Sequence, residues 1–259
     1  MADHKQELRA RIFLRSCLPL MKVVIEERPL YRKLLWRASG VVQFGAEDSE
    51  QGAWVELSDG ALDVKQGKHP SPTISLTFRT LRAMNDFFAG GLALPKVCGV
   101  KGIPCLLRLL PLLLKLKILL PDVVPEDPAE KALKVKMLLY MVTNALSQMN
   151  KGGDPAMSAY VKKSPDRVFQ FTVENGGPAA YLRVKAGRSK AGRGTYTRRR
   201  PYVHMVFSGI DGAFDVLTQR VSTVDAVRYG KLRMEGAMEG GKEIGVMMQR
   251  VEAITTGAE

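Results

Sequence analysis

Apolar and polar positions along the chain follow two different periods. In residues 74–79 the apolar side chains fall on alternate positions, and residues 203–208 repeat this pattern. A period of two predicts strands with one buried face. Longer stretches, about residues 6–36 and 128–160, carry apolar residues at three- and four-residue spacing. This spacing predicts helices ahead of each group of strands.

The two patterns belong to an internal repeat. Residues 41–60 align without a gap with residues 168–187, at an offset of 127. After a two-residue insertion, residues 72–88 lie over residues 201–217. Turn sequences such as DSEQG and ENGGP separate the strands, which favours antiparallel hairpins. A repeat this long predicts two whole domains, because the units of solenoids are about 20 to 50 residues long.

Each copy is predicted to contain a helix, strands, a helix, a strand and a final helix. Strands grouped between helices indicate the α+β class. The segment LPDVVPEDP at 120–128, rich in proline and acidic residues, is the predicted linker. We therefore expect a first domain over residues 1–123 and a second over residues 124–259.

A leucine-rich run, PCLLRLLPLLLKLKILLP, occupies residues 104–121. A membrane span needs about 20 mostly apolar residues with few or no charges. Arg108, Lys115 and Lys117 interrupt this run, as does Pro111, so we do not expect it to span a bilayer. A helix that is apolar nearly all round is either buried on several sides or lies against lipid. Both alternatives stay open on the residues alone.

The chain is strongly basic throughout. Its 259 residues carry a net charge of +13, of which residues 1–120 hold +7 and the remainder +6. This excess suggests an anionic partner, either nucleic acid or acidic lipid headgroups. Cys17, Cys98 and Cys105 form no Cys-x-x-Cys pair, and the N-terminus shows no clear signal-peptide cleavage site. We therefore expect a cytoplasmic protein, with peripheral contact to a membrane as an additional hypothesis.

Catalytic and metal-binding signals are weak. No acidic or cysteine partner accompanies His4, His69 or His204 at the spacing that metal ligands need. The sequence GRSKAGRG at 187–194 departs from the phosphate-loop pattern, because Arg-Gly stands where Lys-Ser or Lys-Thr is required. No Gly-x-Ser-x-Gly elbow occurs. The expectation is a protein that is not an enzyme and holds no metal or cofactor.

A basic segment at 183–200 contains eight cations and no acid. It is interpreted either as a solvated hairpin loop or as a surface that docks on acidic membrane. A nucleic-acid patch is a weaker alternative, because only Tyr196 is present for base stacking. The predicted docking residues are Arg188, Lys190, Arg193, Arg198, Arg199 and Arg200.

Three segments carry a family resemblance: VFQFTVENGGPAAYLRV, YVHMVFSGIDGAFDVL and, at 229–238, YGKLRMEGAM. Together with the element order, they resemble the sterol carrier protein family of nonspecific lipid-transfer proteins. The last segment is similar to the family pattern Gly-Lys-apolar-x-apolar-x-Gly, with Ala237 where the family has Asp. The first copy lacks the opening Gly. The resemblance implies two tandem domains, each with a five-stranded sheet covered by helices and an apolar tunnel that holds lipid.

The resemblance also places the leucine run at the helix that closes the tunnel, which favours lipid contact over plain core for residues 106–120. It implies non-catalytic binding and transfer of a fatty acyl or polyisoprenoid lipid, in which each buried methylene contributes about 0.8 kcal/mol. One alternative is an accessory scaffold that presents an isoprenoid or other lipid to biosynthetic enzymes, and another is a nucleic-acid binder. The predicted cavity residues are Phe44, Phe78, Phe87, Leu106, Leu109 and Leu113 in the first copy, and Phe171, Met205, Phe207, Phe214, Met247 and Met248 in the second.

Overall fold

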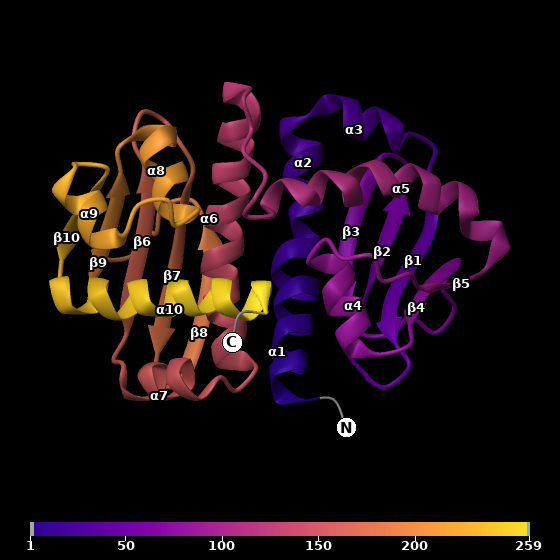
Figure 1. Ribbon diagram of the computed structural model, residues 1–259, viewed down its shortest axis with the longest axis horizontal. Helices are drawn as coiled ribbons and strands as arrows, with labels where there is room; N and C mark the ends of the chain where they lie inside the picture. The colour runs from indigo at the N-terminus through magenta and orange to yellow at the C-terminus, as the bar shows by residue number, and fades with distance from the viewer. Residues whose placement is uncertain (1–2, 258–259) are drawn as a thin grey trace. The chain divides into compact units, whose positions relative to one another are not determined.

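Residues 3–257 are described by a computed structural model. The chain divides into two compact units, Met1–Leu120 and Pro121–Glu259. The domain boundary predicted from the sequence lies after residue 123. Each unit combines a five-stranded sheet with helices, which confirms the predicted α+β class (Figure 1).

The first unit opens with a series of short helical segments where the sequence pattern predicts a longer helical stretch. Pro19 and Pro29 lie at the starts of new segments, because proline lacks the N–H that would continue the preceding helix. The elements are α1 His4–Ile12, the π-helical η1 Phe13–Cys17, the 3₁₀ turn η2 Leu18–Leu20, α2 Met21–Glu27, α3 Pro29–Leu34, β1 Ser39–Ala46, β2 Gly52–Ser58, β3 Ala61–Gln66, β4 Ile74–Phe78, α4 Leu81–Phe88, β5 Lys96–Cys98, η3 Val100–Gly102, α5 Ile103–Lys115 and η4 Leu116–Leu119.

The second unit opens with one long helix. Asp127 caps it by accepting from the backbone N–H groups of Ala129 and Glu130, and Pro128 occupies the first helical position, where its missing N–H costs nothing. The elements are α6 Pro128–Lys151, α7 Pro155–Lys163, β6 Arg167–Val173, β7 Ala179–Lys185, β8 Arg188–Arg193, β9 Val203–Phe207, α8 Gly209–Leu217, α9 Thr223–Arg228, β10 Leu232–Gly236 and α10 Met238–Thr256.

The two sheets have the same topology. The strand order is β3-β2-β1-β4-β5 in the first unit and β8-β7-β6-β9-β10 in the second. One central pair in each sheet is parallel, β1 with β4 and β6 with β9, and the other pairs are antiparallel. The registers also correspond, since Phe44 pairs with Ala53 and Phe171 pairs with Ala180. The mostly antiparallel sheets predicted from the turn sequences are present.

A buried glutamine occupies the same position in the central strand of each sheet. The Nε2 atom of Gln43 donates to the carbonyl oxygens of Phe44 at 2.9 Å, Ala53 at 3.2 Å and Gly67 at 3.3 Å. Its Oε1 atom accepts from the backbone N–H of His69 at 2.6 Å. One side chain therefore connects β1 to β2 and to the segment that follows β3.

Gln170 repeats this arrangement in the second unit. Its Nε2 donates to the carbonyls of Phe171, Ala180 and Gly194 at 3.0 to 3.3 Å, and its Oε1 accepts from the N–H of Tyr196 at 2.9 Å. Every partner is displaced by the 127 residues of the sequence repeat. The repeat therefore extends to the hydrogen bonds of one buried side chain.

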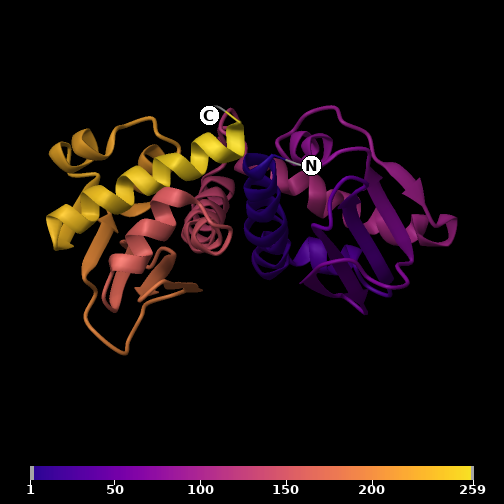
Figure 2. The same cartoon turned by 90° about the horizontal axis from the view of Figure 1, so that it is seen from below.

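Helices cover one face of each sheet (Figures 1 and 2). In the first unit α4 and α5 pack on β1, and in the second α6 packs on β7 and β8 while α8 and α10 pack on β9. Side chains alternate accordingly along β2, where Ala53, Val55 and Leu57 are buried and Trp54 and Glu56 are partly exposed. The apolar core of each unit lies between its sheet and these helices.

Replacing the second buried glutamine tests how much each sheet depends on it. We expect Gln170→Leu to lower the free energy of unfolding by about 2 to 4 kcal/mol, because it leaves buried carbonyl and N–H groups without partners. Urea denaturation followed by circular dichroism measures the change. Gln249→Leu, at an exposed position of α10, is the matched control. An equal, small effect of both substitutions would show that the amide network is dispensable.

Candidate functional site

The predicted cavity residues of the first unit lie in the layer between its sheet and its helices. Phe44 and Phe78 are fully buried, and Phe87 is partly buried. The rings of Phe78 and Phe87 are 5.2 Å apart between centroids, and the rings of Phe44 and Phe88 are 5.8 Å apart. These aromatic contacts join β1 and β4 to α4. The tunnel itself stays a prediction.

Helix α5, formed by the leucine run, has two opposite apolar faces. Cys105, Leu109 and Leu112 form the buried face, and α5 packs on β1. At 100° per residue the opposite direction of the helix is taken by a second stripe at four-, three- and four-residue spacing. This second stripe is exposed, with Leu107 61% accessible to solvent. Its members are Ile103, Leu107, Leu110 and Leu114.

The flanks of α5 differ from each other. Leu106 and Leu113, two of the predicted cavity residues, are half-buried on one flank, between the buried and the exposed stripe. Arg108 and Lys115 lie on the other flank, and Arg108 donates from Nη1 to the carbonyl oxygen of Trp36 at 3.0 Å. An apolar surface therefore runs around α5 from the core, through Leu106 and Leu113, to solvent.

In the second unit the predicted cavity residues divide in a similar way between core and flank. Four of them are almost completely buried between the sheet and α8, and Met247 and Met248 on α10 are half-buried. The buried side of α10 includes Gly240 and Gly241, which allow close contact with Tyr202 and Met234. The four buried residues are Phe171, Met205, Phe207 and Phe214.

Three cations surround the ring of Phe214. Lys131 lies 5.2 Å, Lys134 5.8 Å and Arg220 5.0 Å from its centroid. The Lys134 side chain is fully buried, and its Nζ donates to the carbonyl oxygen of Val123 at 2.6 Å. The sequence pattern gives no indication of this cluster, because its members are brought together only by the packing of α6 on α8.

Burial lowers the pKa of Lys134 to about 8, and repulsion from Arg220 contributes in the same direction. Asp122 opposes the shift. A buried cation of this kind is costly, because the low-dielectric interior favours the neutral amine.

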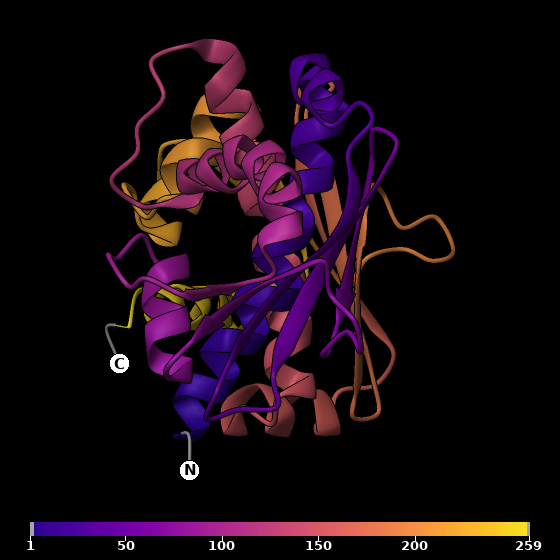
Figure 3. The ribbon, with the colours of Figure 1, turned by 90° about the vertical axis from the view of Figure 1, so that its right-hand side faces the viewer.

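The basic segment of the second unit comprises the end of β7, β8 and the loop that follows β8, which extends away from the sheet (Figure 3). Asp166 neutralises part of it, since its carboxylate accepts from Arg183 at 2.7 and 2.8 Å and pairs with Arg199 at 3.2 Å. These hydrogen bonds lower the pKa of Asp166 to about 2. Arg193 lies over the ring of Tyr140 at 5.0 Å.

Two of the predicted docking residues, Arg193 and Arg199, therefore make contacts that support the fold. The other four are exposed, and within residues 3–257 the structure assigns their side chains no ion pair or hydrogen bond: Arg188, Lys190, Arg198 and Arg200. Asp166 lies seventeen residues before Arg183, so an inspection of the basic segment alone does not find it. Glu235 is likewise distant in the sequence from the residue that it contacts, because its carboxylate is 3.4 Å from His204 across the β9–β10 pair.

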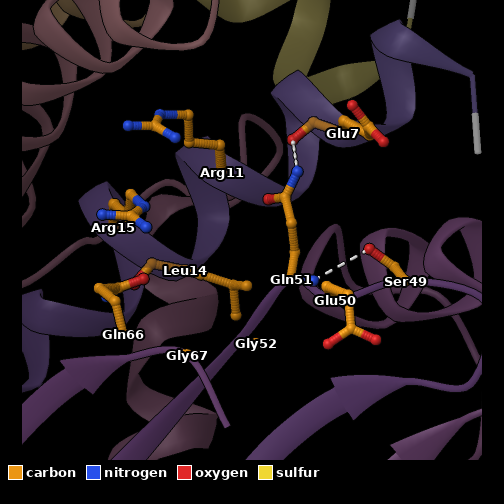
Figure 4. Close-up of a pocket in the computed structure, with 10 residues that line it drawn as sticks. All are labelled: Glu7, Arg11, Leu14, Arg15, Ser49, Glu50, Gln51, Gly52, Gln66 and Gly67. Carbon is orange, nitrogen blue, oxygen red and sulfur yellow. Dashed lines mark hydrogen bonds between the residues drawn. The ribbon is translucent and has the colours of Figure 1, made fainter.

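A polar cleft of about 340 Å³ lies between α1 and the β1–β2 turn of the first unit (Figure 4). The Nε2 atom of Gln51 donates to the carbonyl oxygen of Glu7, and Gln66 donates to that of Leu14. Arg11 and Arg15 line the same cleft, and burial together with repulsion from Arg15 lowers the pKa of Arg11. None of these residues belongs to the predicted apolar cavity.

The cysteines differ in accessibility. Cys17 and Cys105 are buried, and burial raises the pKa of Cys17 to about 12, while Cys98 is exposed. Across residues 3–257, no group of three or more His, Cys, Asp or Glu side chains is arranged to hold a metal ion. Within the same range, no helix has the length and hydropathy that crossing a membrane would require.

No protein-family model matches the sequence, and no curated protein matches it significantly. Among solved structures, the palmitated SCP2L2 from Aedes aegypti is 15% identical, with a TM-score of 0.31 over 41% of this chain and 90% of its own. The UbiJ-SCP2 ubiquinone synthesis protein is 14% identical, with a TM-score of 0.32 over 50% of this chain and 97% of its own.

Sterol carrier protein 2 from Yarrowia lipolytica, in its apo form, is 15% identical, with a TM-score of 0.30 over 39% of this chain and 87% of its own. Similarity at this level does not identify a function. The functional interpretation therefore rests on the side chains described above.

The buried lysine makes stability depend on pH. The native chain releases the Lys134 proton near pH 8, whereas the unfolded chain keeps it to about pH 10.4. The unfolded state binds more protons between these values, so the free energy of unfolding rises with pH there. We expect it to rise by about 2 kcal/mol from pH 7 to 9.5 relative to Lys134→Met, measured by urea denaturation at both pH values. A difference between the two proteins that does not change with pH would contradict the assignment.

Proposed function

We propose that this protein is a non-catalytic lipid carrier with two duplicated lipid-binding units, each holding an acyl or polyisoprenoid chain between its sheet and its helices. The observation that carries the proposal is helix α5, which is apolar on its buried face, its exposed face and the flank between them. A helix of an ordinary core has one apolar side, because its solvent face gains nothing from leucine. A path lined by leucine from solvent to the core suits a ligand that is itself apolar.

The chemistry of the layer behind α5 agrees with such a ligand. Phe44, Phe78 and Leu109 present only carbon to their surroundings and are fully buried. A methylene chain transferred into such a layer gains about 0.8 kcal/mol for each group removed from water. Binding would therefore depend on chain length more than on the headgroup.

The duplication is supported by the shared strand order and by the matching networks of Gln43 and Gln170. The units differ in their last helix, because the exposed side of α10 includes Lys242, Glu243 and Gln249 besides Val246, whereas the exposed stripe of α5 is entirely apolar. We infer that the first unit exchanges lipid more readily, since its closing helix can move across apolar surfaces without burying a charge. The proposed setting is the cytoplasm, next to membranes.

Titration of the intact protein with a fluorescent fatty acid, without vesicles, tests lipid binding. We expect saturable binding that unlabelled fatty acids or polyisoprenoids displace. The double variant Leu106→Lys/Leu113→Lys should weaken binding to the first unit by about tenfold or more and leave the second unit's site, because cations on the flank of α5 oppose entry of an apolar chain. Val224→Lys/Val246→Lys, at exposed positions of the second unit, is the control. If wild type shows no saturable binding of any of several lipid classes, the proposal fails.

The basic segment is proposed to dock the second unit on acidic membrane. Each Lys or Arg near an anionic bilayer contributes about 1 kcal/mol, so Arg198→Glu/Arg200→Glu should reduce sedimentation with acidic vesicles by about tenfold or more. Arg199 is left unchanged because it pairs with Asp166. Arg228→Glu/Lys242→Glu makes the same change of net charge elsewhere on the unit. Equal sedimentation of both variants would show that the position of the charges is unimportant.

A further inference from the structure

The exposed stripe of α5 continues onto a neighbouring helix. In the first unit α3 packs against α5, and the hydrogen bond from Arg108 to the Trp36 carbonyl fixes the end of α3 beside it (Figure 1). Trp36 has 63% of its side chain exposed. We call the resulting surface the α3–α5 face, and its exposed apolar residues are Leu30, Leu34, Trp36, Ile103, Leu107, Leu110 and Leu114.

The charges in the two segments that form this face all have one sign. Residues 28–46 contain four cations and residues 87–121 contain five, and neither segment contains an acid. The acids that directly border these segments in the sequence are Glu27, Glu47, Asp86 and Asp122, and the turn that carries Asp59 hydrogen-bonds to the carbonyl oxygen of Ala38. The two segments that carry the exposed apolar residues thus contribute nine cations and no acid, and the nearest acids in the sequence lie just beyond their ends.

We propose that the α3–α5 face is a membrane-docking surface that inserts its leucines and Trp36 into the headgroup region of an anionic bilayer. Exposed apolar residues framed by Lys and Arg are the pattern of helices that lie in a membrane interface. Tryptophan is enriched at that level, because its ring is amphipathic. Helix α5, with 13 residues, would lie along the surface.

Charge distinguishes this occupant from a second copy of the chain. A symmetric dimer through this face would bring the same patch of each copy together. The cations that these segments carry in both copies would then be brought together, which opposes association. An anionic bilayer instead offers an apolar interior and a negative surface to the same face.

This inference deepens the proposed function and rests on it in one respect, since a carrier of membrane lipids must meet a bilayer to load and unload. It also gives the exposed stripe of α5 a second role. With the stripe in the headgroup region, Leu106 and Leu113 on the flank would lie at the membrane surface. A lipid could then pass between the bilayer and the core without crossing water.

Trp36 reports directly on the proposed insertion. The chain contains two tryptophans, so Trp54→Phe leaves Trp36 as the only one. With vesicles of phosphatidylserine and phosphatidylcholine, we expect the emission of Trp36 to shift to shorter wavelength and to be quenched by brominated lipid. Vesicles of phosphatidylcholine alone should give much weaker effects, because the cations no longer contribute.

Substitution of the stripe tests the leucines. Leu107→Glu/Leu114→Glu should lower partitioning to acidic vesicles by about tenfold or more, because carboxylates replace inserted apolar groups and repel the anionic surface. Val224→Glu/Val246→Glu, which makes the same change at exposed positions of the second unit, should have an effect below about twofold. Circular dichroism and fatty-acid titration without vesicles show whether the stripe variant keeps its fold and its lipid site.

Four results would overturn the inference. In the first, the protein binds acidic vesicles but the fluorescence emission of Trp36 is neither shifted nor quenched, which would mean that docking uses another surface. The second is no vesicle binding at all, which would leave a protein partner for the face. The third is a stripe variant that keeps its fold and binds vesicles as well as wild type. The fourth is a wild-type dimer that the stripe variant dissociates with vesicle binding unchanged. Saturable fatty-acid binding in solution would leave the proposed function intact in all four cases.

Discussion

The sheets of both units depend on a side-chain amide buried in the central strand. Gln43 and Gln170 each bind carbonyl groups of their own strand, of the next strand and of the segment after the third strand, and each accepts one further N–H. A buried amide is stable only when its hydrogen-bonding groups have partners. The register of the antiparallel pair and the course of the chain after the third strand are therefore fixed together. The helices can vary without disturbing this framework.

The last helices of the two units, α5 and α10, differ in how they pack. In the second unit, Gly240 and Gly241 let α10 approach closely, because a Cβ at Gly240 would lie 2.4 Å from the Tyr202 ring. In the first unit, α5 instead uses bulky leucines on both sides. Close packing through glycine favours one fixed position of a helix, whereas a surface of similar leucines fits several positions with similar contacts. The same sheet topology thus carries one final helix packed closely through glycines and one that packs through leucines.

The sequence predicted the elements whose signals are local or repeated. The period of two over residues 74–79 and 203–208 identified β4 and β9, and the alignment of residues 72–88 with 201–217 matched these two strands to each other. Contacts between distant residues were not predictable in the same way. Asp166 neutralises Arg183 and Arg199 because strand pairing brings it there, and Lys134 is buried because α6 packs beside α8. Neither contact has a sequence signal of its own.

The leucine run shows why hydropathy alone left two alternatives. Leucine occurs on two opposite faces of α5 and on one flank, so composition does not distinguish the face that packs on β1 from the face that meets solvent. Packing against the sheet determines which face of the helix is buried. Both alternatives then apply to the same helix, because Leu109 belongs to the core while Leu107 remains exposed. An exposed leucine stripe brings no stability in water and favours aggregation. It is therefore best explained by something that covers it, and the cations on the same two segments favour an anionic surface.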